Sequence, residues 1–396
     1  MIRFSTAGES HGKALVALLE GVPAGLSLVA EDVDIQLRRR MAGHGRGARM
    51  KIESDAVEFL SGVRNGATIG SPIAMLIRNR DWDSWSDVMS AEPDGGEKKD
   101  RRHKVTRPRP GHADLVGALK YDRTDARDIL ERASARETAA RVACGAVCRV
   151  LLAEFSVEIG SHVIQLGDVT GCLPATLPEP LNENADASPV RCLDSEASKA
   201  MVAAIDAAAE ARDTLGGIAE VVVRGLLTGL GSHVSWDRKL DGRLAGALMS
   251  IQGVKGVEIG AGFNAARHSG SEVHDEILAG DSEAGGGFVR ATNRAGGLEG
   301  GMTTGEPLVL RAAMKPISTL RRPLQTVNLE TGLAEEAQSE RSDTTAVPAM
   351  GVIAEAMVAL VLADAAVEKF GGDSLGEMRD NAKAYVVRMN DRFENR

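Results

Sequence analysis

Aromatic residues are scarce in this sequence. Its 396 residues include only 7 Phe, 3 Trp and 2 Tyr, which together make up 3% of the chain. A hydrophobic core must therefore be built mainly from Ala, Val, Leu and Ile. Hydrophobic residues make up 43% and charged residues 26%, which is typical of a soluble globular protein. Glycine is abundant, at 44 residues, and this predicts many tight turns or close approaches of the backbone to a ligand.

Cysteine is also scarce, which argues against two kinds of site. The four cysteines form no C-x-x-C pair and are too few for a disulfide framework in a chain this long, so we expect a reducing compartment. Neither H-E-x-x-H nor a Cys/His zinc pattern occurs, and we expect no metal. Cys144 and Cys148 lie four residues apart on an expected helix. They could be two metal ligands, but a pair facing the core is the favoured interpretation.

Long uninterrupted apolar runs are missing as well. Residues 14–19, ALVALL, are too short for the apolar region of about 7–15 residues in a signal peptide. The most apolar segment, residues 347–367, contains Glu355 and Asp364, whereas a membrane span needs about 20 apolar residues. We therefore expect a buried helix there, no membrane association and a cytoplasmic protein.

The net charge of −9 argues against a general nucleic-acid binder. Basic residues are nevertheless concentrated in two stretches, residues 36–51 with six basic residues and no acidic one, and residues 98–110 with seven and one. Two basic stretches in an acidic chain favour a small anionic ligand over a polyanion. Ordinary solvated charge is the alternative interpretation, and we keep it for residues 98–104.

No Pro/Ser-rich linker divides the chain, so we expect one domain over residues 1–396. Because helical and strand-like segments mix without regular βαβ alternation, we expect an α/β protein of the α+β type with antiparallel sheet. The tetrapeptide VEIG occurs at 157–160 and 257–260, a hint of two similar halves. A capping box at Ser134–Glu137 predicts a helix to about Phe155. The other expected elements are helices over 199–215 and 348–370, strands over 72–77, 219–223 and 308–310, and loops over 90–111 and 171–196.

The segment GESHG, residues 8–12, matches the G-x-S-x-G pattern of serine hydrolases. In that pattern the serine follows a central strand and precedes the acid and the histidine of the triad. Ser10 follows only nine residues, so a hydrolase is disfavoured. The alternative is a polar turn in which Ser10 and His11 lie together, with His11 as an acid or base near neutral pH. Two other matches are weak, a dinucleotide pattern at 260–265 and a phosphate loop at 8–13 that is one residue short.

The segment RPRPGHADL, residues 107–115, is a stronger candidate. Pro108 and Pro110 stiffen the backbone and Gly111 permits a tight turn, so His112 is held near Arg109. A histidine beside an arginine that binds an anion is a good proton donor to that anion. A purely structural loop histidine is the alternative.

Three further segments suit anions. ERASARETAAR, residues 131–141, presents the start of a helix to an anion, with Arg132 and Arg136 close by. KPIST, residues 315–319, offers a lysine and two hydroxyls to a phosphate or a flavin. RSD, residues 341–343, places Arg341 and Asp343 before the last apolar helix, where Asp343 could also be a simple cap.

In this order along nearly the whole chain, these segments resemble the chorismate synthase family. The matching stretches are AGESHG, GHGRGARMKIESD, RPGHAD, ERASARETAARVA, GVEIG, GGMTTGEPL, KPIST and RSDTTAVPA. The resemblance implies a β-α-β sandwich with antiparallel sheets around a helical layer, and a homotetramer. It implies a 1,4-anti elimination that converts 5-enolpyruvylshikimate 3-phosphate to chorismate. The family requires reduced FMN although the reaction has no net redox change, and the flavin is thought to lend an electron and take it back.

The resemblance also implies roles for individual residues. His11 matches the residue that protonates the leaving phosphate, with Ser10 beside it. His112 matches the histidine that protonates reduced flavin, and Asp343 the acid that helps a flavin nitrogen take up the ring hydrogen. Flavin contacts carry over to Arg132, Ala133, Ser134, Gln252, Gly253, Gly300, Lys315, Pro316, Ile317, Ser318, Thr319 and Arg341.

Arginines bind phosphate and carboxylate groups bidentately, so the candidates for binding the substrate are Arg40, Arg46, Arg109, Arg136 and Arg341. For Arg40 and Arg46 an NADPH phosphate is an open alternative. Gly253 departs from the family, which usually has Ala at this position. No added flavin-reductase domain is visible, so we expect an external source of reduced flavin. A phosphate-sugar or flavin-binding protein without turnover is the alternative function.

Overall fold

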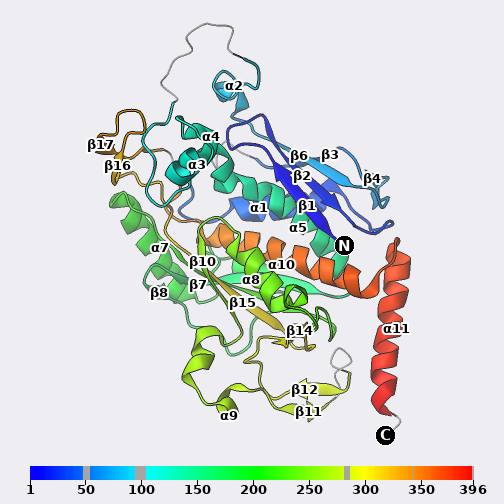
Figure 1. The fold of residues 1–396 in the computed structure, drawn as a ribbon. Coiled ribbons are helices and arrows are strands. Elements are labelled where there is room, and N and C mark those ends of the chain that lie inside the picture. Colours follow the sequence, from blue (N-terminus) through cyan, green and yellow to red (C-terminus); the bar gives the residue numbers. More distant parts are fainter. Residues whose placement is uncertain (48–53, 94–103, 281–285, 341, 395–396) are drawn as a thin grey trace.

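The computed structural model contains two antiparallel sheets with helices between them (Figure 1). It describes residues 1–47, 54–93, 104–280, 286–340 and 342–394. The first sheet has the strand order β1-β2-β6-β3 and the second β10-β15-β9-β7-β8. The strands of the first sheet are β1 (Arg3–Ala7), β2 (Ala14–Glu20), β3 (Val57–Phe59) and β6 (Ile73–Arg78). Those of the second are β7 (Glu158–Leu166), β8 (Val169–Thr170), β9 (Gly217–Arg224), β10 (Val254–Ile259) and β15 (Leu308–Met314).

Apolar residues alternate along the central strands and face the helices. In β2, Leu15, Ala17 and Leu19 are buried, as expected for a strand with one face on the core. The helices between the sheets are α1 (Ala30–Met41), α5 (Thr138–Ala153) and α10 (Val347–Phe370). Helix α5 packs on β2 and on α10, and α10 packs in turn on β7 and β9. The predicted mixture of helices and antiparallel strands is therefore confirmed.

Helix α10 is the centre of the core. It is long and apolar enough to cross a membrane by composition alone, but 83% of its most apolar window is buried inside the protein. A helix that is apolar all round belongs in a core when other elements surround it. The prediction of a buried helix is confirmed, with the start at Val347 instead of Pro348.

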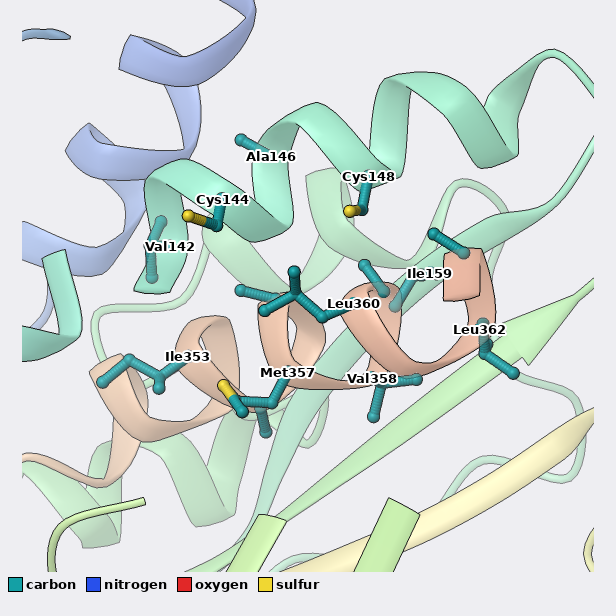
Figure 2. Close-up of a cluster of buried hydrophobic side chains, with 14 of the residues drawn as sticks. Val142, Cys144, Ala146, Cys148, Ile159, Ile353, Met357, Val358, Leu360 and Leu362 are labelled. Atoms are coloured by element: carbon teal, nitrogen blue, oxygen red, sulfur yellow. The ribbon is translucent and has the colours of Figure 1, made fainter. Parts of the chain in front are cut away.

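Cys144 and Cys148 lie in the contact between α5 and α10 and are fully buried (Figure 2). Burial raises the pKa of the Cys144 thiol to about 12. Among the described residues no cluster of His, Cys, Asp or Glu could hold a metal ion. The interpretation of the two cysteines as core residues is confirmed.

Gly145 allows α5 and α10 to approach closely. A Cβ atom at this position would lie 2.4 Å from Cβ and 2.5 Å from Cα of Ala356 on α10. Both atoms belong to a packed helix and cannot move independently, so the two helices would have to separate.

The Gly145→Ala variant is expected to lose about 1–3 kcal/mol of stability through this overlap, although alanine is the better helix former. Gly246 in helix α8 (Leu240–Met249) is the matched control, because nothing lies within 4 Å of a Cβ there. Gly246→Ala should gain about 0.4–1 kcal/mol. Urea unfolding of both variants measures the difference. Equal stabilisation in both would show that the helices accommodate the methyl group.

The remaining elements form short hairpins and outer helices. The hairpin strands are β4 (Val63–Arg64), β5 (Ala67–Thr68), β11 (Ile277–Ala279), β12 (Phe288–Arg290), β13 (Leu298–Glu299), β14 (Met302–Thr303), β16 (Gln325–Val327) and β17 (Ala334–Glu336). The outer helices are α2 (Trp82–Trp85), α3 (Asp114–Lys120), α4 (Arg127–Ala133), α6 (Leu181–Asp186), α7 (Ser195–Glu210), α9 (Gly270–Val273) and α11 (Leu375–Glu394). Short 3-10 helices span Ala135–Glu137, Trp236–Arg238 and Gly262–Arg267.

Several local predictions need correction. Ser134 caps the 3-10 turn Ala135–Glu137, but Glu137 binds Thr6, Arg141 and Gln252 and closes no capping box. The helix proper is α5. The helix expected over 199–215 begins at Ser195, because Asp194 caps it, and ends at Glu210. The expected loop 171–196 contains α6 and the start of α7. The two VEIG copies reach into β7 and β10 of the same sheet.

Candidate active site

Ser10 and His11 lie in the connection between β1 and β2. Gly8 makes this turn possible, because it has a φ of +105° and a Cβ there would lie 2.4 Å from the carbonyl oxygen of Ala14. A strand-to-strand turn is not the strand-to-helix elbow of a hydrolase, so that alternative is wrong. Ser10 is buried, and its Oγ accepts a hydrogen bond from Oγ of Ser134 (3.2 Å). The structure thus brings Ser10 to the end of α4.

The side chain and the backbone of His11 both contact the buried carboxylate of Glu131. Its Nδ1 lies 2.9 Å from Oε2 of Glu131, and its backbone N–H donates to the same oxygen at 2.9 Å. The imidazole stacks on Trp85 with 4.1 Å between ring centroids. Arg127 donates to Oε1 of Glu131 (2.7 Å). Burial raises the pKa of Glu131, but the hydrogen bonds from His11 and the charge of Arg127 outweigh it, so this pKa is lowered.

His112 is held in the same way. Its Nδ1 lies 2.5 Å from Oδ1 of Asp114, whose side chain is fully buried. Arg109 donates from Nε to Oδ2 of Asp114 (2.8 Å) and from Nη1 to Oγ1 of Thr319 (2.7 Å). Burial alone raises the pKa of Asp114, but the hydrogen bonds from His112 and Arg109 hold it well below its ordinary value. The predicted proximity of His112 and Arg109 is present in the structure.

The predicted flavin residues gather around His112 and the end of α4. Lys315 donates from Nζ to the carbonyl oxygen of Gly111 (2.5 Å). Its backbone N–H donates to the carbonyl oxygen of Gly253 (2.9 Å). Gln252 donates from Nε2 to Oε2 of Glu137 (2.9 Å). Arg132 donates from Nη2 to the carbonyl oxygen of Thr6 (2.8 Å), next to Ala133 and Ser134. The segment Pro316–Thr319 joins this group through Thr319, which binds Arg109.

Gly300 lies apart from this group. It occupies the turn between β13 and β14, where a Cβ would lie near Met302 and His233. Figure 1 shows β14 near β11 and β12, far from α3 and α4. Arg341, another expected flavin contact, lies outside the described residues.

Arg40 and Arg136 are buried side by side on one carboxylate. Arg136 donates from Nη1 to Oδ1 of Asp55 (2.6 Å), and Nη1 of Arg40 lies 3.5 Å from Oδ2. Arg136 also donates from Nε to Oδ1 of Asn79 (3.0 Å). Burial lowers the pKa of Arg40 to about 10 against the opposing charge of Asp55. Both arginine side chains are buried with Asp55, and at most 4% of each is exposed.

Asp343 and Arg46 form an ion pair close enough to Arg40 to influence its pKa. Arg46 lies with Nη1 2.9 Å from Oδ2 of Asp343, and the backbone N–H of Gly47 donates to Oδ1 at 2.6 Å. The residue that caps α10 is Ala346, so the interpretation of Asp343 as a cap is wrong. Asp343 and Thr319 line the same small cavity. Ser342 donates from Oγ to the carbonyl of Thr319 (2.7 Å) and ties the two segments together.

Sequence reasoning missed the carboxylates that hold the histidines and arginines. Asp114 was within reach, because it follows His112 by two residues in RPGHAD. The pairing of Glu131 with His11 and that of Asp55 with Arg136 carried no signal, since these partners lie 120 and 81 residues apart in the sequence.

The site contains two histidines bound to buried carboxylates, with several arginines nearby. This arrangement is typical of an enzyme that exchanges protons with a small anionic substrate. Comparison with known proteins names the family. The model of the chorismate synthase family matches residues 2–367. The chorismate synthases of Salinispora tropica and Thermobifida fusca are 57% and 56% identical over 391 residues, with 98% of both chains covered. A solved structure described as "Crystal Structure of Chorismate Synthase" superposes with a TM-score of 0.78 at 44% identity, covering 98% of each chain.

The chain belongs to the chorismate synthase family. The expected function, that of a chorismate synthase in the shikimate pathway, and the expected fold are thereby confirmed. The chain is an enzyme that catalyses a phosphate elimination.

Proposed function

We propose that the site around His11 and His112 carries out the 1,4-anti elimination of phosphate and a ring proton from 5-enolpyruvylshikimate 3-phosphate. One observation carries this proposal: each histidine side chain is partly exposed and is paired with its own buried carboxylate. Such a ring can hold a proton and pass it on without leaving its place.

His11 is the proton donor to the departing phosphate in this proposal. Phosphate leaves readily only when its developing charge is neutralised. A proton at Nε2 of His11 supplies that neutralisation, because Nδ1 is occupied by Glu131. Ser10 and Ser134 come from different segments, but their hydroxyl oxygens lie 3.2 Å apart, and both would orient the phosphate oxygens. The side chain of Arg46 is 10% exposed and that of Arg109 7%, so both are better placed for a ligand than Arg40 and Arg136, which are at most 4% exposed. An NADPH phosphate is the alternative ligand of Arg46 and Arg40.

The residues near His112 fit a flavin. Oε1 of Gln252 is a buried acceptor that has no hydrogen-bond partner in the part of the chain that the structure describes. A ring N–H of a flavin is the kind of donor that it lacks. Gln252, Gly253, Lys315–Thr319 and Arg132–Ser134 would hold FMN. When bound and reduced, FMN supplies the transient electron that the elimination requires. His112 would hold the proton to be transferred at Nε2. Asp343 lines the same small cavity as Thr319, accepts a hydrogen bond from Gly47 at Oδ1 and pairs with Arg46 through Oδ2.

Three further properties belong to the proposal through family membership. These are a single domain over residues 1–396 that assembles as a homotetramer, a cytoplasmic location, and an external source of reduced flavin. Gly300 and Arg341 are proposed flavin contacts on the resemblance alone.

An anaerobic assay tests the function. The protein is mixed with dithionite-reduced FMN and 5-enolpyruvylshikimate 3-phosphate, and chorismate absorbance and phosphate release are followed together. We expect equal amounts of both products, and none with oxidised FMN. Substituting NADPH for dithionite should give no turnover if reduction is external. A folded, flavin-binding protein that forms no chorismate would contradict the proposal and leave a binding protein.

A further inference from the structure

The two histidines share one arrangement although they come from distant segments. Each has Nδ1 on a carboxylate whose side chain is at most 1% exposed, and each carboxylate also accepts from an arginine. The arginines are Arg127 for Glu131 and Arg109 for Asp114. Glu340 lies between them, with Oε1 3.4 Å from Nη2 of Arg127 and Oε2 4.0 Å from Nη1 of Arg109.

The protonation of the carboxylates decides the orientation of the hydrogen bonds. The pKa values of Glu131 and Asp114 are both lowered, so both groups are ionised near neutral pH. An ionised carboxylate only accepts hydrogen bonds. Nδ1 of each histidine therefore carries the hydrogen of the bond. For His112 the contact with Asp114 (2.5 Å) is shorter than that of Nδ1 with Nη2 of Arg109 (3.1 Å), a group that could only donate to it. A neutral ring then has its lone pair on Nε2, and a cationic ring has its transferable proton there.

Neither carboxylate is able to turn away. Glu131 accepts from the backbone N–H and from Nδ1 of His11 and from Arg127. Asp114 accepts from the backbone N–H and the guanidinium of Arg109 as well as from His112. The stack on Trp85 further limits rotation of the His11 ring. Each ring is thus fixed in orientation as well as in tautomer.

We propose that Glu131 and Asp114 are positioning residues that hold the hydrogen of His11 and His112 on Nδ1 and thereby make Nε2 the reacting nitrogen of both. The inference rests on the proposed function of the two histidines. It adds that their chemistry depends on two acids that touch no substrate, and that removing either acid's charge reverses the tautomer of one ring only.

The Glu131→Gln variant tests this directly. Arg127 continues to donate to the amide oxygen at the position of Oε1, so the amide NH₂ takes the position of Oε2 and faces Nδ1 of His11. This favours the tautomer with hydrogen on Nε2 and gives up the hydrogen bond from the backbone N–H of His11. We expect the ring ¹⁵N resonances of His11 to exchange their protonated and unprotonated positions in the resting protein, without any ligand. We expect kcat to fall about 10²–10⁴-fold with KM changed little, by analogy with the serine-protease triad, where the amide replacement of the acid costs about 10⁴. Glu131→Asp should recover part of kcat.

Asp114→Asn makes the same prediction for His112 and keeps the inference testable if Glu131→Gln does not fold. The control is Glu220→Gln. Glu220 also binds a buried histidine, His162 (3.2 Å), and an arginine, Arg311 (2.8 Å), but on the second sheet. The Glu220→Gln variant should be less stable than the unaltered protein, but its folded form should keep the same kcat. The ring resonances of His11 and His112 are assigned by their absence in His11→Ala and His112→Ala.

The outcomes separate the inference from the proposed function. Full activity of His11→Ala would refute the role of His11. Loss of activity in His11→Ala together with unchanged kcat, or unchanged ring resonances, in Glu131→Gln would refute the positioning role alone.

Discussion

Replacing His11 with alanine is expected to lower the turnover number about 10²–10⁴-fold, the usual contribution of a general acid. The protein should keep its fold, because Glu131 retains Arg127 as a partner and the turn is held by Gly8. His112→Ala should lose activity by a similar factor. The anaerobic assay with reduced FMN measures both, and thermal unfolding verifies the fold.

His268→Ala is the matched control for these variants. His268 is exposed, and its Nδ1 lies 2.9 Å from the carbonyl oxygen of Asn264 four residues earlier. Its removal should leave turnover unchanged. If His11→Ala kept more than a tenth of the activity of the unaltered protein, the phosphate would not depend on a proton from His11.

Replacing Glu355 with glutamine is expected to cost about 3–5 kcal/mol of stability, because it removes the buried charge that three arginines share, and in the described part of the chain only Arg39 and Arg191 keep a second carboxylate, that of Asp186. Glu355 lies on α10 with 1% of its side chain exposed. It accepts from Arg39 (2.8 Å), Arg149 (2.7 Å), Arg191 (3.1 Å) and Ser161 (2.6 Å). These partners come from α1, α5, β7 and the segment before α7, so one carboxylate ties four parts of the fold to α10.

The same cluster predicts a pH dependence. Burial would raise the pKa of Glu355, but the charges of Arg39 and Arg149 outweigh it and lower the pKa to about 2. A carboxylate whose pKa is lowered by folding stabilises the protein fully above its unfolded pKa. That contribution is lost as the pH falls toward the folded pKa. Between about pH 5 and pH 2 the unaltered protein should therefore lose more stability than Glu355→Gln.

Urea unfolding at several pH values measures this difference. The control is Glu196→Gln, which removes the exposed pair with Lys199 (2.7 Å) and should cost less than about 1 kcal/mol. Parallel pH curves for Glu355→Gln and the unaltered protein would show that the carboxylate adds no acid-dependent stability.

Much of the architecture could be predicted because its signals are local. The apolar run of α10, its proline at the start and Gly371 at the end are contiguous, and the alternation in β2 and β6 reads directly from neighbouring residues. Element ends were less predictable. The prediction of a capping box at Ser134 was wrong, because the side chain of Glu137 accepts hydrogen bonds from Thr6 and Gln252, both distant in sequence.

The candidate site divides in the same way. The sequence by itself supplied the candidate reacting groups and favoured a small anionic ligand, since His11, His112 and the arginines among glycines and prolines are local features. Only the tertiary structure decided which of these groups are buried and which carboxylate each one binds. Arg40 and Arg136 are buried against Asp55, and Nδ1 of His11 contacts Glu131 from 120 residues away. Charge neutralisation acts between neighbours in space, so a partner that folding brings from a distant segment leaves no trace in the spacing of the chain.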